Sequence, residues 1–146
     1  PSHVVLELTE SVLIDPREEI DRVLRDIRDA GISLALDDFG SGYSSLGYLR
    51  RYPIDVLKLD TSYTHGLLTD TGTRIIAEGV VTMASRLGLR VVAEGVETEE
   101  QLEIVRDLGI DWAQGNLLGE PISVDDTVDV LQAERSRHGD LLATDG

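Results

Sequence analysis

Two neighbouring acidic residues are the clearest candidates for chemistry. Asp37 and Asp38 follow directly on the short apolar segment Ser33–Leu36. Adjacent ionised carboxylates repel each other, and keeping both charged beside a core is unfavourable unless a cation compensates them. In two-metal hydrolysis one carboxylate can bridge the ions while its neighbour holds the second ion. The alternative is a loop in which both acids only cap the next turn.

Other polar side chains lie within or at the ends of apolar segments. Lys58 could orient an attacking water or bind a phosphoryl oxygen, or it could simply pair with Asp60. Glu94 follows the apolar segment Arg90–Ala93 and could act as a general base or hold a water. Glu7 lies among apolar neighbours near the end of the first strand and could belong to the same site. The alternative is a solvent-facing position on an edge strand.

A repeated rhythm of elements is expected to position these residues. A short apolar strand is followed by a loop and an amphipathic helix that stops at glycine. The expected strands are Val4–Leu8, Ser33–Leu36, Val56–Leu59, Arg90–Ala93 and Asp111–Ala113. The expected helices are Pro16–Ala30, Leu46–Arg51, Thr73–Leu87, Thr98–Leu108 and Ser123–Arg135, with capping boxes at Asp15/Glu18 and Thr98/Gln101.

Strands that alternate with helices predict a parallel sheet with helical crossovers. The sheet could be open and doubly wound, or it could close as a (β/α)₈ barrel. The polar residues favour the barrel, because the carboxyl ends of barrel strands converge on one mouth. A complete barrel needs about 250 residues. We therefore predict an incomplete TIM-like barrel, comprising about the last five β/α units, over residues 1–135 and a flexible tail over 136–146.

Composition restricts the possible partners. The 146-residue chain is 41% hydrophobic and has no cysteine, so it can form a core but neither disulfides nor thiolate metal sites. Its net charge of −15 argues against binding to DNA or to an anionic membrane surface. A phosphate ligand would need an intervening cation, and divalent metals suit carboxylate oxygens. The apolar runs are too short to span a membrane, and we expect a cytoplasmic location.

Several motifs together resemble the EAL domain family, in the same order and with the same spacing. They are Glu7-Leu8-Thr9-Glu10-Ser11, the segment Asp37–Leu46, Lys58-Leu59-Asp60, Ala93-Glu94-Gly95-Val96-Glu97-Thr98 and Gln114-Gly115. The similarity runs from about Val4 to Ser123. It implies a phosphodiesterase that hydrolyses cyclic di-GMP to linear pGpG with two Mg²⁺ or Mn²⁺ ions.

The resemblance also implies roles for individual residues. Glu7 would bind the first metal, Asp37 would bridge the two ions and Asp38 would bind the second. Lys58 and Glu94 would position and activate the attacking water, and Gln114 would lie at the water or substrate. Glu10 and Glu97 would support the loop that links the metals to a dimer interface. Substrate contacts are expected from Asp60, Gly115 and Pro121.

The sequence also departs from the family pattern. The Glu-Ala-Leu signature and an asparagine metal ligand, both expected upstream, are absent from this chain. We therefore expect the chain alone to hydrolyse cyclic di-GMP very slowly or not at all, and to self-associate through its open barrel edge. The alternative function is a regulatory module that binds cyclic di-GMP without cleaving it.

Overall fold

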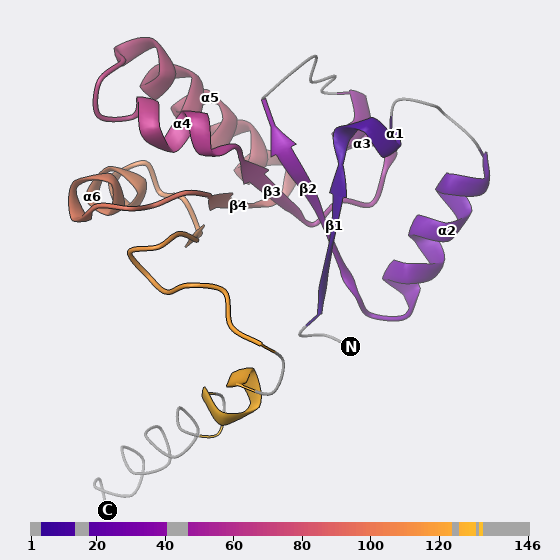
Figure 1. The fold of residues 1–146 in the computed structure, drawn as a ribbon. Helices are drawn as coiled ribbons and strands as arrows, with labels where there is room; N and C mark the ends of the chain where they lie inside the picture. Colours follow the sequence, from indigo (N-terminus) through magenta and orange to yellow (C-terminus); the bar gives the residue numbers. More distant parts are fainter. Residues whose placement is uncertain (1–3, 14–17, 41–46, 124–125, 131, 133–146) are drawn as a thin grey trace, which may run out of the picture.

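The computed structural model describes residues 4–13, 18–40, 47–123, 126–130 and 132. Within them, five parallel strands form one sheet in the sequential order β1-β2-β3-β4-β5 (Figure 1). The strands are β1 (Val5–Thr9), β2 (Ser33–Phe39), β3 (Val56–Leu59), β4 (Arg90–Ala93) and β5 (Trp112–Ala113). A doubly wound sheet reverses its strand order at a switch point, whereas a barrel does not. The order therefore confirms the TIM-like barrel prediction.

Helices connect the strands. They are α1 (Glu10–Leu13), α2 (Glu18–Asp29), α3 (Gly47–Arg51), α4 (Thr61–Gly66), α5 (Thr71–Leu87) and α6 (Glu99–Asp107). Residues 126–130 and 132 are also helical, whereas Ser123, the predicted first residue of this helix, is not; the other residues of the predicted last helix and the predicted tail lie outside the described residues. The same is true of the predicted first helical turn at Asp15 and Pro16. No helix in the described segments has the length and apolarity needed to cross a membrane.

Local capping explains where the helices begin. The Thr98/Gln101 capping box of α6 is present as predicted. The predicted start of α5 at Thr73 was wrong, because the Asp70 carboxylate accepts hydrogen bonds from the N–H groups of Gly72 and Thr73 and starts the helix at Thr71. The pKa of Asp70 is lowered by its hydrogen bonds to Thr73 and Gly72. The short helices α1 and α4 were not predicted, since neither is long enough to show helical periodicity.

The central strands are buried on both faces. The outer face of the sheet and the helices enclose the main core, which includes Leu34, Leu36, Leu57 and Leu59. Alternation along the strands places Ala35, Val56 and Val92 on the opposite face, where they form a second and smaller apolar cluster. This inner face corresponds to the interior of the barrel.

Two aspartates fix neighbouring strands to each other at the start of the sheet. Asp55, just before β3, accepts a 3.0 Å hydrogen bond from the N–H of Leu34, the second residue of β2. Asp111, just before β5, accepts a 2.8 Å hydrogen bond from the N–H of Val91, the second residue of β4. An aspartate side chain thus fixes the register of two strand pairs, β2 with β3 and β4 with β5.

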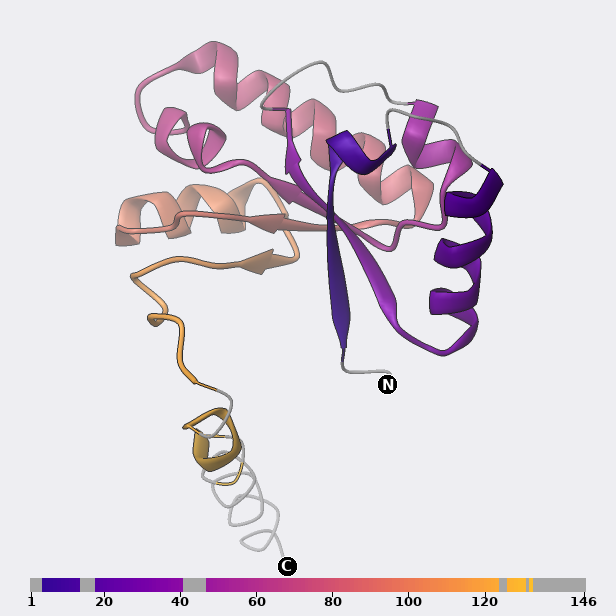
Figure 2. The same cartoon turned by 45° about the vertical axis from the view of Figure 1, so that its right-hand side comes forward.

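The five strands do not close on themselves. β1 and β5 are the two edges of the sheet, and β1 passes in front of β2 in the second view (Figure 2). The side chains of Val5 and Leu6 on β1 are 46% and 41% exposed, although valine and leucine favour burial. The fold therefore leaves apolar surface uncovered at the β1 edge.

Candidate active site

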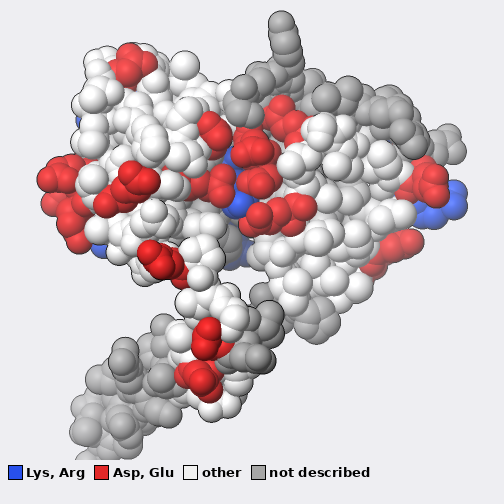
Figure 3. Space-filling view, viewed as in Figure 1, with Lys and Arg blue, Asp and Glu red and all other residues white. Residues whose placement is uncertain are grey.

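The polar residues predicted at the strand ends do converge. Register and alternation put Glu7, Asp37, Lys58 and Glu94 on the inner face. Asp37, Lys58 and Glu94 each lie two residues beyond the apolar cluster of Ala35, Val56 and Val92, and Glu7 pairs with Ala35. In the space-filling view, acidic side chains gather around a small basic patch at the centre of the molecule (Figure 3). We call this group of Glu7, Asp37, Asp38, Lys58 and Glu94 the acidic mouth.

A register shift in β2 explains how two consecutive aspartates both reach the mouth. Successive side chains of a regular strand point to opposite faces. Leu36 pairs with Leu57 but Phe39 pairs with Leu59, so β2 has one extra residue between these points. Asp38 takes a left-handed backbone conformation there, with φ of 55°. Such bulges re-aim side chains, and carboxylate oxygens of Asp37, Asp38 and Glu94 lie within 4.8 Å of one another.

Lys58 lies at the centre of the acidic mouth. Its side chain is almost fully buried, and Nζ lies 2.7 Å from Glu94, 2.9 Å from Asp37 and 2.9 Å from Glu7. The possible pair with Asp60 does not form. Asp60 instead caps α4 by accepting a hydrogen bond from the N–H of Ser62.

The mouth shifts the pKa of two of its groups. Burial alone would lower the pKa of Lys58, but the ion pairs with Glu94, Asp37 and Glu7 outweigh burial and raise it. Lys58 is therefore charged at neutral pH. Burial raises the pKa of Glu94, and the nearby carboxylates of Asp37 and Glu7 act in the same direction against the opposing effect of Lys58. A carboxyl group with a raised pKa is a better proton acceptor than an ordinary one.

The donor set fits divalent metal ions. Asp37, Asp38 and Glu94 offer only carboxylate oxygens, which hard cations such as Mg²⁺ prefer. Asp37 Oδ1 is buried and lies 2.9 Å from Lys58 Nζ, with no further partner within the described residues. This oxygen thus keeps a lone pair available to a further ligand.

The loop after β4 holds Glu94 in place. The Gln101 side chain is buried, and its Oε1 accepts hydrogen bonds from the N–H groups of Glu97 at 2.7 Å and Thr98 at 3.0 Å. Gly95 has φ of 68°, and a side chain there would overlap Thr61. A side chain at Gly115 would overlap the backbone of Val96. Close backbone packing therefore fixes the loop from two sides.

The remaining predicted residues lie around this loop or at the margin. Glu97 is half exposed, with Oε2 3.8 Å from Nε2 of His65 on α4. Gln114 and Pro121 are exposed, and Glu10 begins α1 directly after β1. The structure thus brings Glu7, Asp37, Asp38, Lys58 and Glu94 together, whereas Asp60 caps α4 and Pro121 is exposed.

Sequence reasoning missed Gln101 as a support of the site. The sequence presents it only as half of a capping box, because its burial and its bond to the loop are visible only in the structure. We expect Gln101→Ala to lower the free energy of unfolding by about 1–3 kcal/mol, because two partly buried N–H groups lose their acceptor. Urea denaturation would measure this change. The exposed neighbour Glu103 provides the control Glu103→Ala, and an equal effect of both variants would contradict the assignment.

The sheet order and the polar set at its carboxyl edge are those of a TIM-like (β/α) barrel domain. A matching solved structure, the EAL domain of Mycobacterium smegmatis DcpA, has a TM-score of 0.82 and 38% identity over 90% of this chain and 59% of that chain. The family described as EAL domain matches residues 1–121. This chain belongs to the EAL domain family.

Two further relatives bear on chemistry. The cyclic di-GMP phosphodiesterase NbdA of Pseudomonas aeruginosa is 41% identical over 130 residues, which cover 89% of this chain and 17% of NbdA. A Klebsiella pneumoniae BlrP1 structure is a manganese and cyclic di-GMP complex, with a TM-score of 0.74 and 38% identity over 80% of this chain and 30% of that chain. This chain therefore spans only part of the proteins that it matches.

Proposed function

We propose that this chain forms the downstream part of a cyclic di-GMP phosphodiesterase domain, which hydrolyses cyclic di-GMP to linear pGpG. The observation that carries the proposal is Lys58, buried among three carboxylates at the mouth of a barrel. The family and the phosphodiesterase names among its relatives support the substrate.

The proposed residue roles follow from the site. Glu7, Asp37 and Asp38 would hold two Mg²⁺ or Mn²⁺ ions, which when bound would neutralise phosphoryl charge and lower the pKa of a water. Lys58 would orient that water, and Glu94 would accept its proton. Attack at phosphorus breaks the bond to one ribose 3′ oxygen, which leaves with a proton. Gln114 and Gly115 would contact water or substrate, with Asp60 and Pro121 at the substrate margin.

Support residues and assembly complete the proposal. Glu10 and Glu97 would brace the loops on either side of the mouth. The apolar groove between β1 and α2, about 390 Å³ and lined by Leu6, Leu8 and Val23 among others, supports self-association at the open edge. A cytoplasmic location would suit an enzyme that acts on an intracellular second messenger.

The open sheet also suggests that the chain alone is nearly inactive. Glu7 lies on the uncovered edge strand, and its side chain is 49% exposed, compared with 22% for Asp37 and 16% for Glu94. A metal ligand on an unsupported edge is poorly positioned for catalysis. Activity is expected only when further strands cover β1.

A chromatographic assay of cyclic di-GMP conversion, with Mg²⁺ or Mn²⁺, tests both the proposed activity of the intact domain and the proposed inactivity of the isolated chain. The 146-residue chain and a full-length parent protein are compared side by side. We expect metal-dependent pGpG production by the parent alone. Turnover by the isolated chain would contradict its proposed inactivity, while binding without turnover by the parent would contradict the proposed enzyme.

A further inference from the structure

A groove on the outer surface concentrates positive charge in a strongly acidic protein. It encloses about 630 Å³ between α2 and α3 and is lined by four arginines and two aspartates, together with Tyr52 and Pro53. The four arginines are Arg25, Arg28, Arg50 and Arg51. The lining therefore carries a net charge of +2 in a chain whose net charge is −15. Its volume lies in the range of small-molecule sites.

The sequence brings these arginines together through two elements. On α2, residues 21, 25, 28 and 29 fall on one helical face, because positions three and four apart are neighbours. Arg50 and Arg51 end α3, and Tyr52 follows with only 4% of its surface exposed. The Arg51 guanidinium lies 5.2 Å from the centre of the Tyr52 ring. The groove is thus lined on one side by the largely buried ring of Tyr52.

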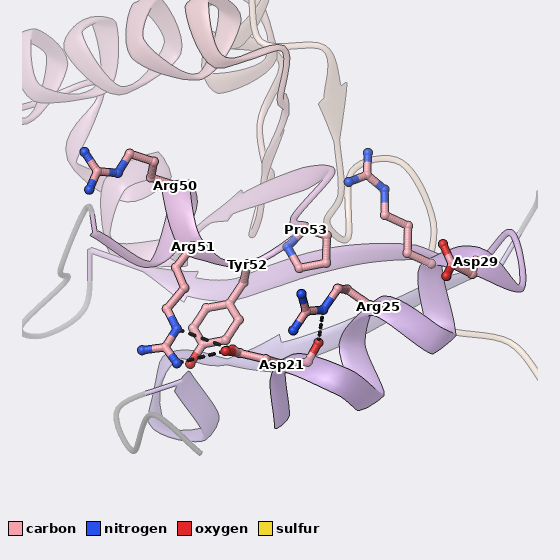
Figure 4. A pocket seen from close by; sticks show the side chains of 8 residues that line it. Asp21, Arg25, Asp29, Arg50, Arg51, Tyr52 and Pro53 are labelled. Atoms are coloured by element: carbon pink, nitrogen blue, oxygen red, sulfur yellow. Dashed lines mark hydrogen bonds and ion pairs between the residues drawn. The ribbon is translucent and has the colours of Figure 1, made fainter. Parts of the chain in front are cut away.

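Some of the positive charge has a structural purpose. Arg51 donates to both carboxylate oxygens of Asp21, at 2.9 and 3.3 Å, and ties α3 to α2 (Figure 4). Arg28 lies 3.6 Å from Asp55. Asp55 also accepts the backbone hydrogen bond from Leu34, so its charge is shared. These pairs account for two of the four arginines.

The other two arginines keep most of their hydrogen-bonding capacity. Among the described residues, Arg25 donates only through Nε, to the backbone oxygen of Asp21 at 2.8 Å. Arg50 extends from α3 away from Arg25 and away from the carboxylates drawn with it, at the other end of the groove (Figure 4). Each guanidinium has five N–H donors in a planar fork that suits phosphate oxygens. The groove therefore offers unused guanidinium donors from both α2 and α3 and an excess of positive charge in its lining.

The groove is separate from the acidic mouth. α2 contributes Leu24 and Ile27 to the core on the outer face of the sheet, whereas the mouth residues lie on the inner face. A free anion would be repelled by the carboxylates of the mouth unless metal ions were bound there. The arginine groove needs no such intermediary.

We propose that the groove between α2 and α3 binds a small anion that carries two or more linked phosphate groups. Arg25 and Arg50 provide the principal contacts, and Arg51 and Arg28 reinforce the local charge while they hold the helices together. The site does not depend on the phosphodiesterase assignment.

Titration calorimetry of the full chain with tripolyphosphate, at low ionic strength and without divalent metal, tests the site. We expect saturable binding that the double variant Arg25→Gln/Arg50→Gln weakens by at least about tenfold, because two charge-assisted contacts are lost. The matched control Arg86→Gln/Arg106→Gln removes the same charge from α5 and α6 and should bind tripolyphosphate nearly as tightly as the unmodified chain does. Circular dichroism verifies that both variants remain folded, since all four side chains are exposed.

Three results would overturn the proposal. They are no measurable binding of tripolyphosphate, equal losses in the two double variants, or citrate binding as tightly as tripolyphosphate. Equal losses would mean that only the overall charge matters. Equal binding of citrate would remove the preference for phosphate that planar guanidinium pairs predict.

Discussion

Exchange of Asp37 for asparagine in the full-length protein is expected to reduce the kcat of cyclic di-GMP hydrolysis by at least about 100-fold. Loss of a residue that only orients a metal ligand already costs 10–100-fold in affinity or activity, so loss of a bridging ligand should cost at least as much. Asparagine keeps the size of the side chain but removes the charge that two cations would share. The buried Oδ1, which lies 2.9 Å from the Lys58 ammonium group, would no longer be anionic.

Kinetics at saturating Mg²⁺ or Mn²⁺ would measure the effect of Asp37→Asn. Asp107, an exposed aspartate at the end of α6, supplies the control Asp107→Asn, which should leave kcat within about twofold of the unmodified enzyme, as expected for a surface position. Near-full activity of Asp37→Asn would remove the two-metal assignment. If only the KM for the metal rose, and a higher metal concentration restored kcat, Asp37 would contribute to metal binding and not to the chemical step.

Replacement of Lys58 by methionine should destabilise the metal-free chain by about 3 kcal/mol. Removal of one partner from a buried ion pair typically costs about 3–5 kcal/mol, and the half-exposed Glu7 places this case at the lower end. Three carboxylates would then face one another without a compensating charge. A divalent cation can replace the ammonium group, so Mn²⁺ should restore part of the lost stability.

Thermal unfolding in chelator and in Mn²⁺ would test this exchange of cations. The melting temperature of Lys58→Met should fall by about 10 °C in chelator, as expected for a loss of this size in a small domain. Mn²⁺ should raise it by more than it raises that of the unmodified chain. Arg86→Met, at an exposed position on α5, is the control. An equal Mn²⁺ shift in both variants would show that Lys58 and the metals do not share the carboxylates.

Local signals made most of the fold predictable. Mostly apolar segments of three to five residues located the strands, and the Thr98/Gln101 box fixed the start of α6. The position of polar residues after those runs identified the mouth, because parallel strands place their carboxyl ends at one edge. These features depend on residues close together in the sequence, which is why sequence patterns reveal them.

The details of the site depended on tertiary pairing and were not predictable in the same way. The extra residue in β2 becomes visible only when Phe39 is found opposite Leu59. The partners of Lys58 come from three other strands or strand ends, while the nearby Asp60 was a reasonable but wrong local choice. Gln101 likewise gains its importance from the loop that it supports rather than from its helix.

The aspartates that precede β3 and β5 have a consequence for the opposite end of the sheet. Each locks the second residue of a neighbouring strand, and a parallel strand advances by about 3.3 Å per residue. A slip of two residues would preserve the apolar alternation, yet it would move Asp37 by about 6.6 Å along β3 and out of reach of Lys58. Hydrophobicity alone therefore cannot distinguish the productive alignment from its neighbours. Asp55 and Asp111 therefore fix the strand register at the amino ends of the strands, on which the geometry at their carboxyl ends depends.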